Sequence, residues 1–226
     1  IAIEGILKPP YIPITLGHEP AGTIAKVGPG VDRWKIGERV CVMPGLSCGE
    51  CINCLDGRES ACLKAGLTGF TTEGALAQFI KIPADHLARL PDNVPFEHGA
   101  IITDAVATPY HAITRRGRLK AGEKVAVIGC GGLGIHAVQI ARLCGAAIIV
   151  AIDTSPVALD RSHKVGATHT VDASKGNAHR LVRDITNGGV DLAVECIGHS
   201  HTLDQAIKCL RKGGRAVTVG LSSEKI

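Results

Sequence analysis

Short alternating or apolar stretches, each cut off by Gly or Pro, occupy the chain up to about residue 105. Clear examples are 21–27, 39–43 and 74–82. Such stretches predict β-strands joined by turns. Beyond them, apolar runs alternate with amphipathic segments, which predicts βαβ units around a parallel sheet. The pattern therefore predicts a mainly β first part and an α/β second part.

The second part contains a regular succession of predicted elements. A helix over 104–115 leads into strands at 124–128, 148–152, 190–194 and 215–219, with a helix at 135–143. A further helix is expected from the apolar spacing i, i+3, i+4, i+7, and glycines should end it. The apolar positions are Leu203, Ala206, Ile207 and Leu210, and the glycines are Gly213 and Gly214. We expect the domain boundary between 104 and 120 and divide the chain into 1–110 and 111–226.

Composition and charge exclude several classes of protein. The 226 residues are 45% hydrophobic and carry a formal net charge of +4, which is too small and too scattered to favour binding to nucleic acid or a membrane surface. The longest apolar run, 144–152, ends at Asp153 and is far shorter than the roughly 20 residues of a membrane helix. We therefore expect a soluble protein. The chain begins at Ile1 without Met, and a doubly wound sheet usually has six strands, so we expect further segments at both ends.

Four of the nine cysteines form a tight group with the spacing Cys48-x2-Cys51-x2-Cys54-x7-Cys62. Four thiolates in one short loop can enclose a tetrahedral Zn²⁺ and leave no open position, so the predicted role is structural. An iron–sulfur cluster is an alternative, although the bacterial ferredoxin spacing has three residues before the fourth cysteine. Packed or disulfide-bonded cysteines are another. Closely spaced thiols without a visible secretion signal favour a reducing, cytoplasmic location.

A G-x-G-x-x-G run follows the buried strand at 124–128 and opens the next predicted helix. Gly129 permits the tight turn, Gly131 lets the backbone approach a pyrophosphate, and Gly134 permits close helix packing. Asp153 ends the second strand, where a carboxylate binds the ribose hydroxyls of NAD and repels the 2′-phosphate of NADP. An ordinary glycine-rich turn with Asp153 as a helix cap is the alternative. The candidate cofactor-binding residues are Gly129, Gly131, Gly132, Leu133, Gly134 and Asp153.

His18 stands in the run Gly17-His18-Glu19 of the β-rich part. Imidazole is the commonest metal ligand, but a lone histidine is more often a structural or surface residue. The residues alone leave both readings open.

Taken in order, the run 17–22 (GHEPAG), the four-cysteine loop, Asp104 and the glycine turn with Asp153 resemble the zinc-dependent alcohol dehydrogenases of the medium-chain dehydrogenase/reductase family. The segments 27–40, 74–82 and 194–198 also look similar. The resemblance implies a GroES-like β-rich catalytic domain followed by a Rossmann-type doubly wound parallel sheet, with the active site in the cleft between them.

The resemblance also implies catalytic roles for three residues. His18 and Asp104 would be ligands of a catalytic zinc, and Glu19 a neighbouring or alternate ligand. Asp104 could instead cap the helix that is expected to start there. By the same resemblance, the first ligand, a cysteine, would lie before Ile1.

The implied reaction is the oxidation of an alcohol to an aldehyde or ketone, with hydride transfer to NAD. Zinc would lower the pKa of the alcohol as a Lewis acid. The small-molecule substrate could equally be a polyol or an amino alcohol, and the family implies a homodimer or homotetramer. Two alternatives remain: a zinc-free reductase of the same fold, and a non-catalytic NAD-binding protein with only a structural metal.

Overall fold

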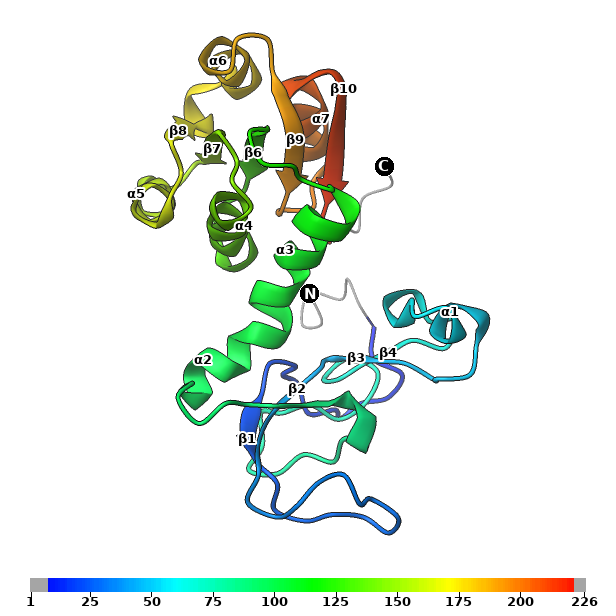
Figure 1. The fold of residues 1–226 in the computed structure, drawn as a ribbon. Helices are drawn as coiled ribbons and strands as arrows, with labels where there is room; N and C mark the ends of the chain where they lie inside the picture. Colours follow the sequence, from blue (N-terminus) through cyan, green and yellow to red (C-terminus); the bar gives the residue numbers. More distant parts are fainter. Residues whose placement is uncertain (1–7, 222–226) are drawn as a thin grey trace. The chain divides into compact units, whose positions relative to one another are not determined.

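A computed structural model describes residues 8–221 of the protein, and the chain divides into two units between Asp104 and Ala105 (Figure 1). Each unit has its own sheet and its own buried side chains. They are described in turn.

The first unit is built on a three-stranded antiparallel sheet in which β2 is central. Its strands are β1 (Ala21–Thr23), β2 (Arg39–Val42) and β5 (Leu87–Arg89). Ile24, Trp34 and Val40 form a small core beside it, and the Trp34 indole Nε1 donates to the carbonyl of Ala84 at 2.8 Å. The strands are short, and much of the unit between them is loop.

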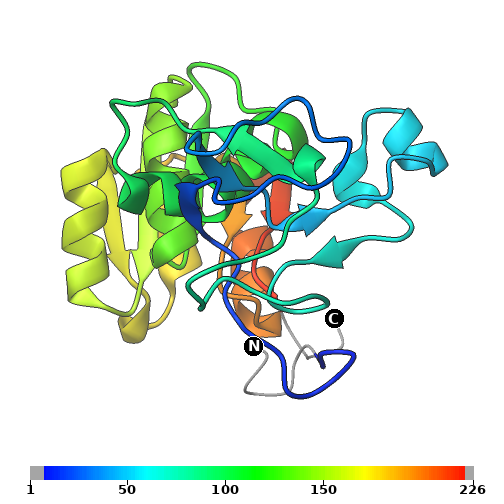
Figure 2. The same ribbon diagram turned by 90° about the horizontal axis from the view of Figure 1, so that it is seen from below.

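A second feature of this unit is the ribbon that β3 (Gly45–Leu46) makes with β4 (Gly66–Leu67). The chain between these strands carries α1 (Ile52–Leu55) and a 3₁₀ turn, Glu59–Ala61. Another 3₁₀ turn, Ala84–His86, precedes β5. The segment with α1 projects from the ribbon in both views (Figures 1 and 2).

Two predictions for this unit need correction. The strand predicted over 21–27 ends at Thr23, and 74–82 forms no strand. The backbone N–H groups of Gly74, Ala75 and Leu76 instead donate to the carbonyls of Thr15, Gly17 and Leu16 at 2.7–2.9 Å. The apolar side chains there do not reach a core, since Leu76 and Phe79 are exposed.

The helical segment predicted over 104–115 exists but begins earlier, after Pro95. It consists of α2 (Phe96–Ile101), a π-helical stretch Ile102–Val106, α3 (Ala107–Tyr110) and a second π-helical stretch His111–Arg116. Asp104 lies inside the first π-helical stretch. The alternative that Asp104 caps a helix is therefore wrong.

The second unit contains a five-stranded, wholly parallel sheet in the order β10-β9-β6-β7-β8, which confirms the Rossmann-type fold. Its strands are β6 (Lys124–Ile128), β7 (Ile148–Asp153), β8 (His169–Asp172), β9 (Val190–Glu195) and β10 (Leu210–Thr218). A 3₁₀ turn, Ala173–Lys175, follows β8. The helices are α4 (Gly132–Leu143), α5 (Pro156–Val165), α6 (Ala178–Ile185) and α7 (Ser200–Cys209).

Helices cover both faces of this sheet. Helices α4 and α5 pack together on one face, and α6 and α7 on the other (Figures 1 and 2). Along β6, Val125 and Val127 belong to one core, and Ala126 and Ile128 to the other. Because both faces are buried, the strands read as continuous apolar runs, as the sequence predicted.

The buried face of α7 differs from the apolar stripe that the sequence predicted for this helix. The buried residues of α7 are Thr202, Ala206 and Cys209, whereas Ile207 is 55% exposed. Leu210 already begins β10, so the helix ends before the glycines that were expected to end it.

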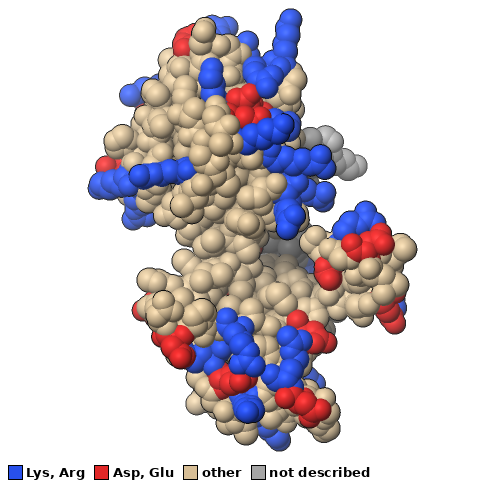
Figure 3. All heavy atoms as spheres, viewed as in Figure 1, with Lys and Arg blue, Asp and Glu red and all other residues tan. Residues whose placement is uncertain are grey.

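On the face shown in Figure 3, basic and acidic side chains are interspersed, in line with the small net charge. Within residues 8–221, no helix is both long and apolar enough to cross a bilayer.

A forked ion pair joins Glu123, directly before the first strand of the parallel sheet, to Arg215 on its last strand. The Arg215 guanidinium on β10 donates to the Glu123 carboxylate at 2.6 and 3.1 Å, and its Nε donates to the carbonyl of Gly117 at 2.6 Å. Arg215 thereby lowers the pKa of Glu123. The Glu123 side chain is 16% exposed, so solvent screens this pair only in part.

We expect Glu123→Gln to lower the free energy of unfolding by about 1 kcal/mol near neutral pH. The folded-state pKa of Glu123 is depressed, so its stabilising effect is complete above the unfolded value of about 4.3 and is lost as the pH falls through the folded value. The difference between wild type and variant in urea unfolding should therefore shrink in acid. Asp204→Asn, in an exposed pair with Lys208, is the control and should change little at any pH.

Candidate metal and dinucleotide sites

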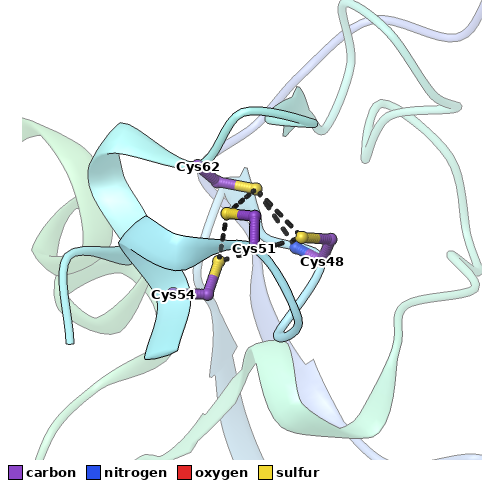
Figure 4. A group of neighbouring side chains, drawn as sticks. All are labelled: Cys48, Cys51, Cys54 and Cys62. Carbon is purple, nitrogen blue, oxygen red and sulfur yellow. Dashed lines mark hydrogen bonds between the residues drawn. The ribbon is translucent and has the colours of Figure 1, made fainter. Parts of the chain in front are cut away.

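Cys48, Cys51, Cys54 and Cys62 converge in the segment between β3 and β4, with their sulfurs directed toward one another (Figure 4). All four sulfurs lie within 4.8 Å of one another, and neighbouring pairs are 3.5–4.0 Å apart. Zn–S bonds of about 2.3 Å in a tetrahedron separate the sulfurs by about 3.8 Å. The donor set therefore fits one zinc ion.

The same distances argue against a disulfide and against an iron–sulfur cluster. A disulfide needs sulfurs about 2.05 Å apart, and all nine cysteines, which lie within the described residues, are free thiols. A cluster of several irons and sulfides does not fit among four sulfurs this close together. The segment is thus built for a single tetrahedral ion with no open position, which is the structural type of site.

The local backbone prepares part of this group for a cation. The N–H of Leu63 is the largest of the influences that lower the pKa of Cys51 to about 6, and the N–H of Glu50 lowers the pKa of Cys48. Burial raises the pKa of Cys54 to about 12. A coordinating thiol is deprotonated by the metal itself, so Zn²⁺ would supply the charge that burial withholds from Cys54.

His18 and Asp104, which are 86 positions apart in the chain, meet in the first unit. The imidazole Nε2 lies 2.9 Å from the carboxylate Oδ2, and both side chains are about 30% exposed. This hydrogen bond with Asp104 raises the pKa of His18, which the charge of the adjacent Glu19 also favours. The structure thus brings His18 and Asp104 together, and Glu19 directly follows His18 in the chain. These are the three residues for which the family resemblance implies catalytic roles.

Close backbone contacts hold His18 in place. Gly17 has φ +97, a conformation that favours glycine, and the carbonyls of Leu16 and Gly17 accept hydrogen bonds from Leu76 and Ala75. The Phe70 ring packs on the imidazole with centroids 5.3 Å apart at a tilt of 59°. The sequence analysis missed Phe70, whose only signal is its place in the glycine-rich segment 66–74.

The π-helical stretch Ile102–Val106 carries Asp104. A π-bulge changes the direction of the side chains in a helix and occurs often at functional sites. Among the described residues, the cysteine group is the one set of three or more potential ligands whose donor atoms converge, and His18 and Asp104 make a pair.

The G-x-G-x-x-G turn has the geometry that the sequence predicted. Gly129 has φ +83, and a Cβ on Gly134 would lie 1.8 Å from the carbonyl oxygen of Gly129. A Cβ on Gly131 or Gly132 would meet nothing within 4 Å. The turn therefore leaves open space in front of the N-terminus of α4, where backbone N–H groups attract an anion such as a pyrophosphate.

Asp153 connects the end of β7 to this turn. Its Oδ2 accepts the backbone N–H of Cys130 at 2.7 Å, and its Oδ1 accepts that of Ser155 at 2.8 Å. Ser155 is the N-cap of α5, so the alternative that Asp153 caps this helix is wrong. Leu133 follows Gly132 in the first turn of α4 and is half-buried.

Two family models and several relatives match this chain. Residues 2–92 match the model of the alcohol dehydrogenase GroES-like domain, and residues 132–226 match that of the zinc-binding dehydrogenases. Sorbitol dehydrogenase of Bacillus subtilis is 38% identical over 214 residues, which are 94% of this chain and 60% of the relative. Alcohol dehydrogenase of Geobacillus stearothermophilus is 37% identical over 219 residues, 96% of this chain and 64% of the relative.

The structure of an alcohol dehydrogenase from Thermus sp. ATN1 superposes with a TM-score of 0.91 and 32% identity, covering 98% of this chain and 66% of that one. The two family models together define the class of the chain: an alcohol dehydrogenase GroES-like domain followed by a region of the zinc-binding dehydrogenase type. The chain belongs to the zinc-dependent alcohol dehydrogenases of the medium-chain dehydrogenase/reductase family, and it spans about 60% of the length of these curated relatives.

We expect Cys48→Ser to remove one equivalent of zinc per chain, because a structural site binds its ion through all four thiolates. Since the energy of metal binding is also folding energy, the variant should unfold at a lower temperature. Elemental analysis and thermal unfolding measure the two effects. Cys144→Ser, outside the cysteine group, is the control. Unchanged zinc content in Cys48→Ser would disprove the assignment.

Proposed function

We propose that this protein is a zinc- and NAD-dependent dehydrogenase that oxidises an alcohol to an aldehyde or ketone. The observation that carries the proposal is the pairing of His18 with Asp104 at 2.9 Å, because histidine nitrogen and carboxylate oxygen are both ligands that bind catalytic zinc. Membership of the family supports it. The relatives named for sorbitol and for alcohol support a small hydroxyl-bearing substrate, which includes polyols and amino alcohols.

The His18–Asp104 pair fits a zinc ion after a small movement. Tetrahedral ligands at about 2.1 Å from zinc are about 3.4 Å apart, so the two atoms would separate by roughly half an ångström as the ion replaces their hydrogen bond. His18 and Asp104 would hold this metal, with Glu19 as a neighbouring or alternate ligand. The Cys48 group would hold the structural zinc.

When bound, zinc supplies Lewis acidity toward an alcohol oxygen, and NAD supplies the acceptor for hydride. The residues of this chain would bind and orient the zinc ion and the dinucleotide. The open backbone at Gly131 and Gly132 would receive the pyrophosphate, with Gly129, Leu133 and Gly134 shaping the turn. The Asp153 carboxylate has lone pairs beyond its two backbone bonds and would accept the adenosine ribose hydroxyls.

We further propose a cytoplasmic homodimer or homotetramer. The nine free thiols support a reducing compartment, and the family resemblance supports the assembly.

We expect two zinc ions per chain in the full-length protein. Asp104→Ala should lose one of them and lower kcat for alcohol oxidation by about 100-fold or more, because the Lewis acid contributes several kcal/mol. Elemental analysis and steady-state kinetics on an alcohol panel test this. Asp85→Asn, at an 82% exposed side chain of the same unit, is the control. One zinc in the wild type, lost with Cys48→Ser, would favour an NAD-binding protein with only a structural metal.

We expect Asp153→Asn to narrow the preference for NAD over NADP by about tenfold, since it removes the charge that repels a 2′-phosphate. The asparagine Oδ1 can still accept one of the two backbone N–H groups, so the turn should persist. The ratio of kcat/KM for the two cofactors measures the change. Asp160→Asn on the exposed side of α5 should leave the ratio unchanged, and an unaltered ratio in Asp153→Asn would contradict the assignment.

A further inference from the structure

Glu195 is a buried carboxylate at the end of β9 to which the sequence analysis gave no role. It is 1% exposed. Its Oε1 accepts the backbone N–H groups of Ile197 and Gly198 and the hydroxyl of Thr202, each at 2.8 Å. Its Oε2 is buried and has no hydrogen-bond partner among residues 8–221. A buried carboxyl oxygen that accepts three hydrogen bonds strongly constrains the backbone that supplies two of them.

The backbone of Glu195 ties the same turn to its neighbours. The carbonyl oxygen of Glu195 accepts the N–H of Val219 at 2.7 Å, and the next residue, Cys196, donates to the carbonyl of Ile128 at 2.9 Å. The turn after β9 is therefore joined to the end of β6 and to the chain that follows β10.

The strand order indicates that a bound dinucleotide would lie over the Ile197–Gly198 turn after β9. Ligands of open α/β sheets bind at the carboxyl ends of the strands where the chain reverses its order, which here is between β6 and β9. Asp153, assigned to the adenosine ribose, ends β7, and the glycine turn, assigned to the pyrophosphate, follows β6. The next strand in the sheet is β9. The other half of the dinucleotide would therefore extend over the turn at Ile197 and Gly198.

Direct contact connects the two turns. A Cβ on Gly129 would lie 2.4 Å from Cγ1 of Ile197, so the Ile197 side chain rests against the glycine turn. Ile197 is nevertheless 41% exposed, which leaves an apolar surface beside the pyrophosphate site.

We propose that Glu195 is a positioning residue for the dinucleotide, which fixes the Ile197–Gly198 turn so that it can receive the nicotinamide half. The inference rests on the proposed NAD-dependent function. Glu195 itself does not touch the cofactor in this account. Its removal would leave the N–H groups of Ile197 and Gly198 without this acceptor, while the Thr202 hydroxyl keeps the carbonyl of His199 within 2.9 Å. The turn would then adopt other conformations, and the fraction competent to bind NAD would fall.

The test compares the whole dinucleotide with its adenosine half. In Glu195→Ala we expect the Kd for NAD to rise by about tenfold or more. The Kd for AMP should stay within about twofold, because AMP lacks the nicotinamide half that is proposed to lie on the Ile197–Gly198 turn. Glu195→Gln keeps an Oε1 that can accept the same three donors and should lie between wild type and Glu195→Ala. Isothermal titration calorimetry on the full-length protein gives both constants.

Asp191→Asn is the matched control. Asp191 also lies on β9, at its opposite end, where its carboxylate accepts the N–H of Lys124 at 2.7 Å and pairs with Arg211. This variant perturbs the same strand away from the turn, so neither constant should change.

The outcomes separate the two proposals. A wild type that does not bind NAD overturns the proposed function and this inference with it. A wild type that binds NAD while both Glu195 variants bind it equally well overturns the inference alone. An equal loss of NAD and AMP affinity also overturns it, since that result indicates general damage to the domain. If Glu195→Ala does not fold, the same two constants are compared between Glu195→Gln and wild type. A raised Kd for NAD with an unchanged Kd for AMP supports the inference, and an unchanged Kd for NAD overturns it.

Discussion

The second unit depends on a backbone contact too close for any side chain. A Cβ on Gly134 would lie 1.8 Å from the carbonyl of Gly129, so α4 can start directly against the end of β6 only with glycine at that position. Ala137, Val138 and Ala141 of α4 are then fully buried against the sheet. The packing that forms the core therefore also fixes the direction of the N-terminus of α4, the proposed pyrophosphate site.

A comparable constraint shapes the first unit. A Cβ on Gly69 or Gly74 would lie 2.4 Å from the backbone of Gly17 or Leu16, so these segments cross where larger residues would clash. This crossing brings the segment with Phe70 onto His18, whose imidazole then faces Asp104. In each unit the candidate site follows from close backbone approach, and the functional side chains stand where that approach leaves room.

These constraints explain which features the sequence could predict. The strands β6, β7 and β9 are buried on both faces and read as apolar runs, and the cysteine spacing alone suggested the metal site. In contrast, β8 was missed, because its edge position leaves His169 and Thr170 exposed.

Long-range contacts account for the other failures. The pairing of His18 with Asp104 spans 86 positions and came into view only through the family resemblance. Glu195 lies in the segment 194–198 that looks similar to the family, but the sequence indicated no role for it. The donors that define its role are backbone groups and a threonine whose placement depends on the finished fold.

The segment between β3 and β4 that carries the four cysteines, here called the cysteine lobe, differs from the His18–Asp104 pair and from the glycine turn in what stabilises it. Helix α1 has four residues, too few to persist by itself, and the apolar side chains Ile52, Leu55 and Leu63 are 62–72% exposed. Hydrophobic burial therefore contributes little to the lobe, and the groups that converge inside it are the four sulfurs. Zinc binding to these sulfurs would therefore be coupled to the folding of this segment. The parallel sheet of the second unit instead has two apolar cores. The two candidate sites thus depend on different physical means: proposed metal ligation in the cysteine segment, where few apolar side chains are buried, and close apolar packing where the chain forms the parallel sheet.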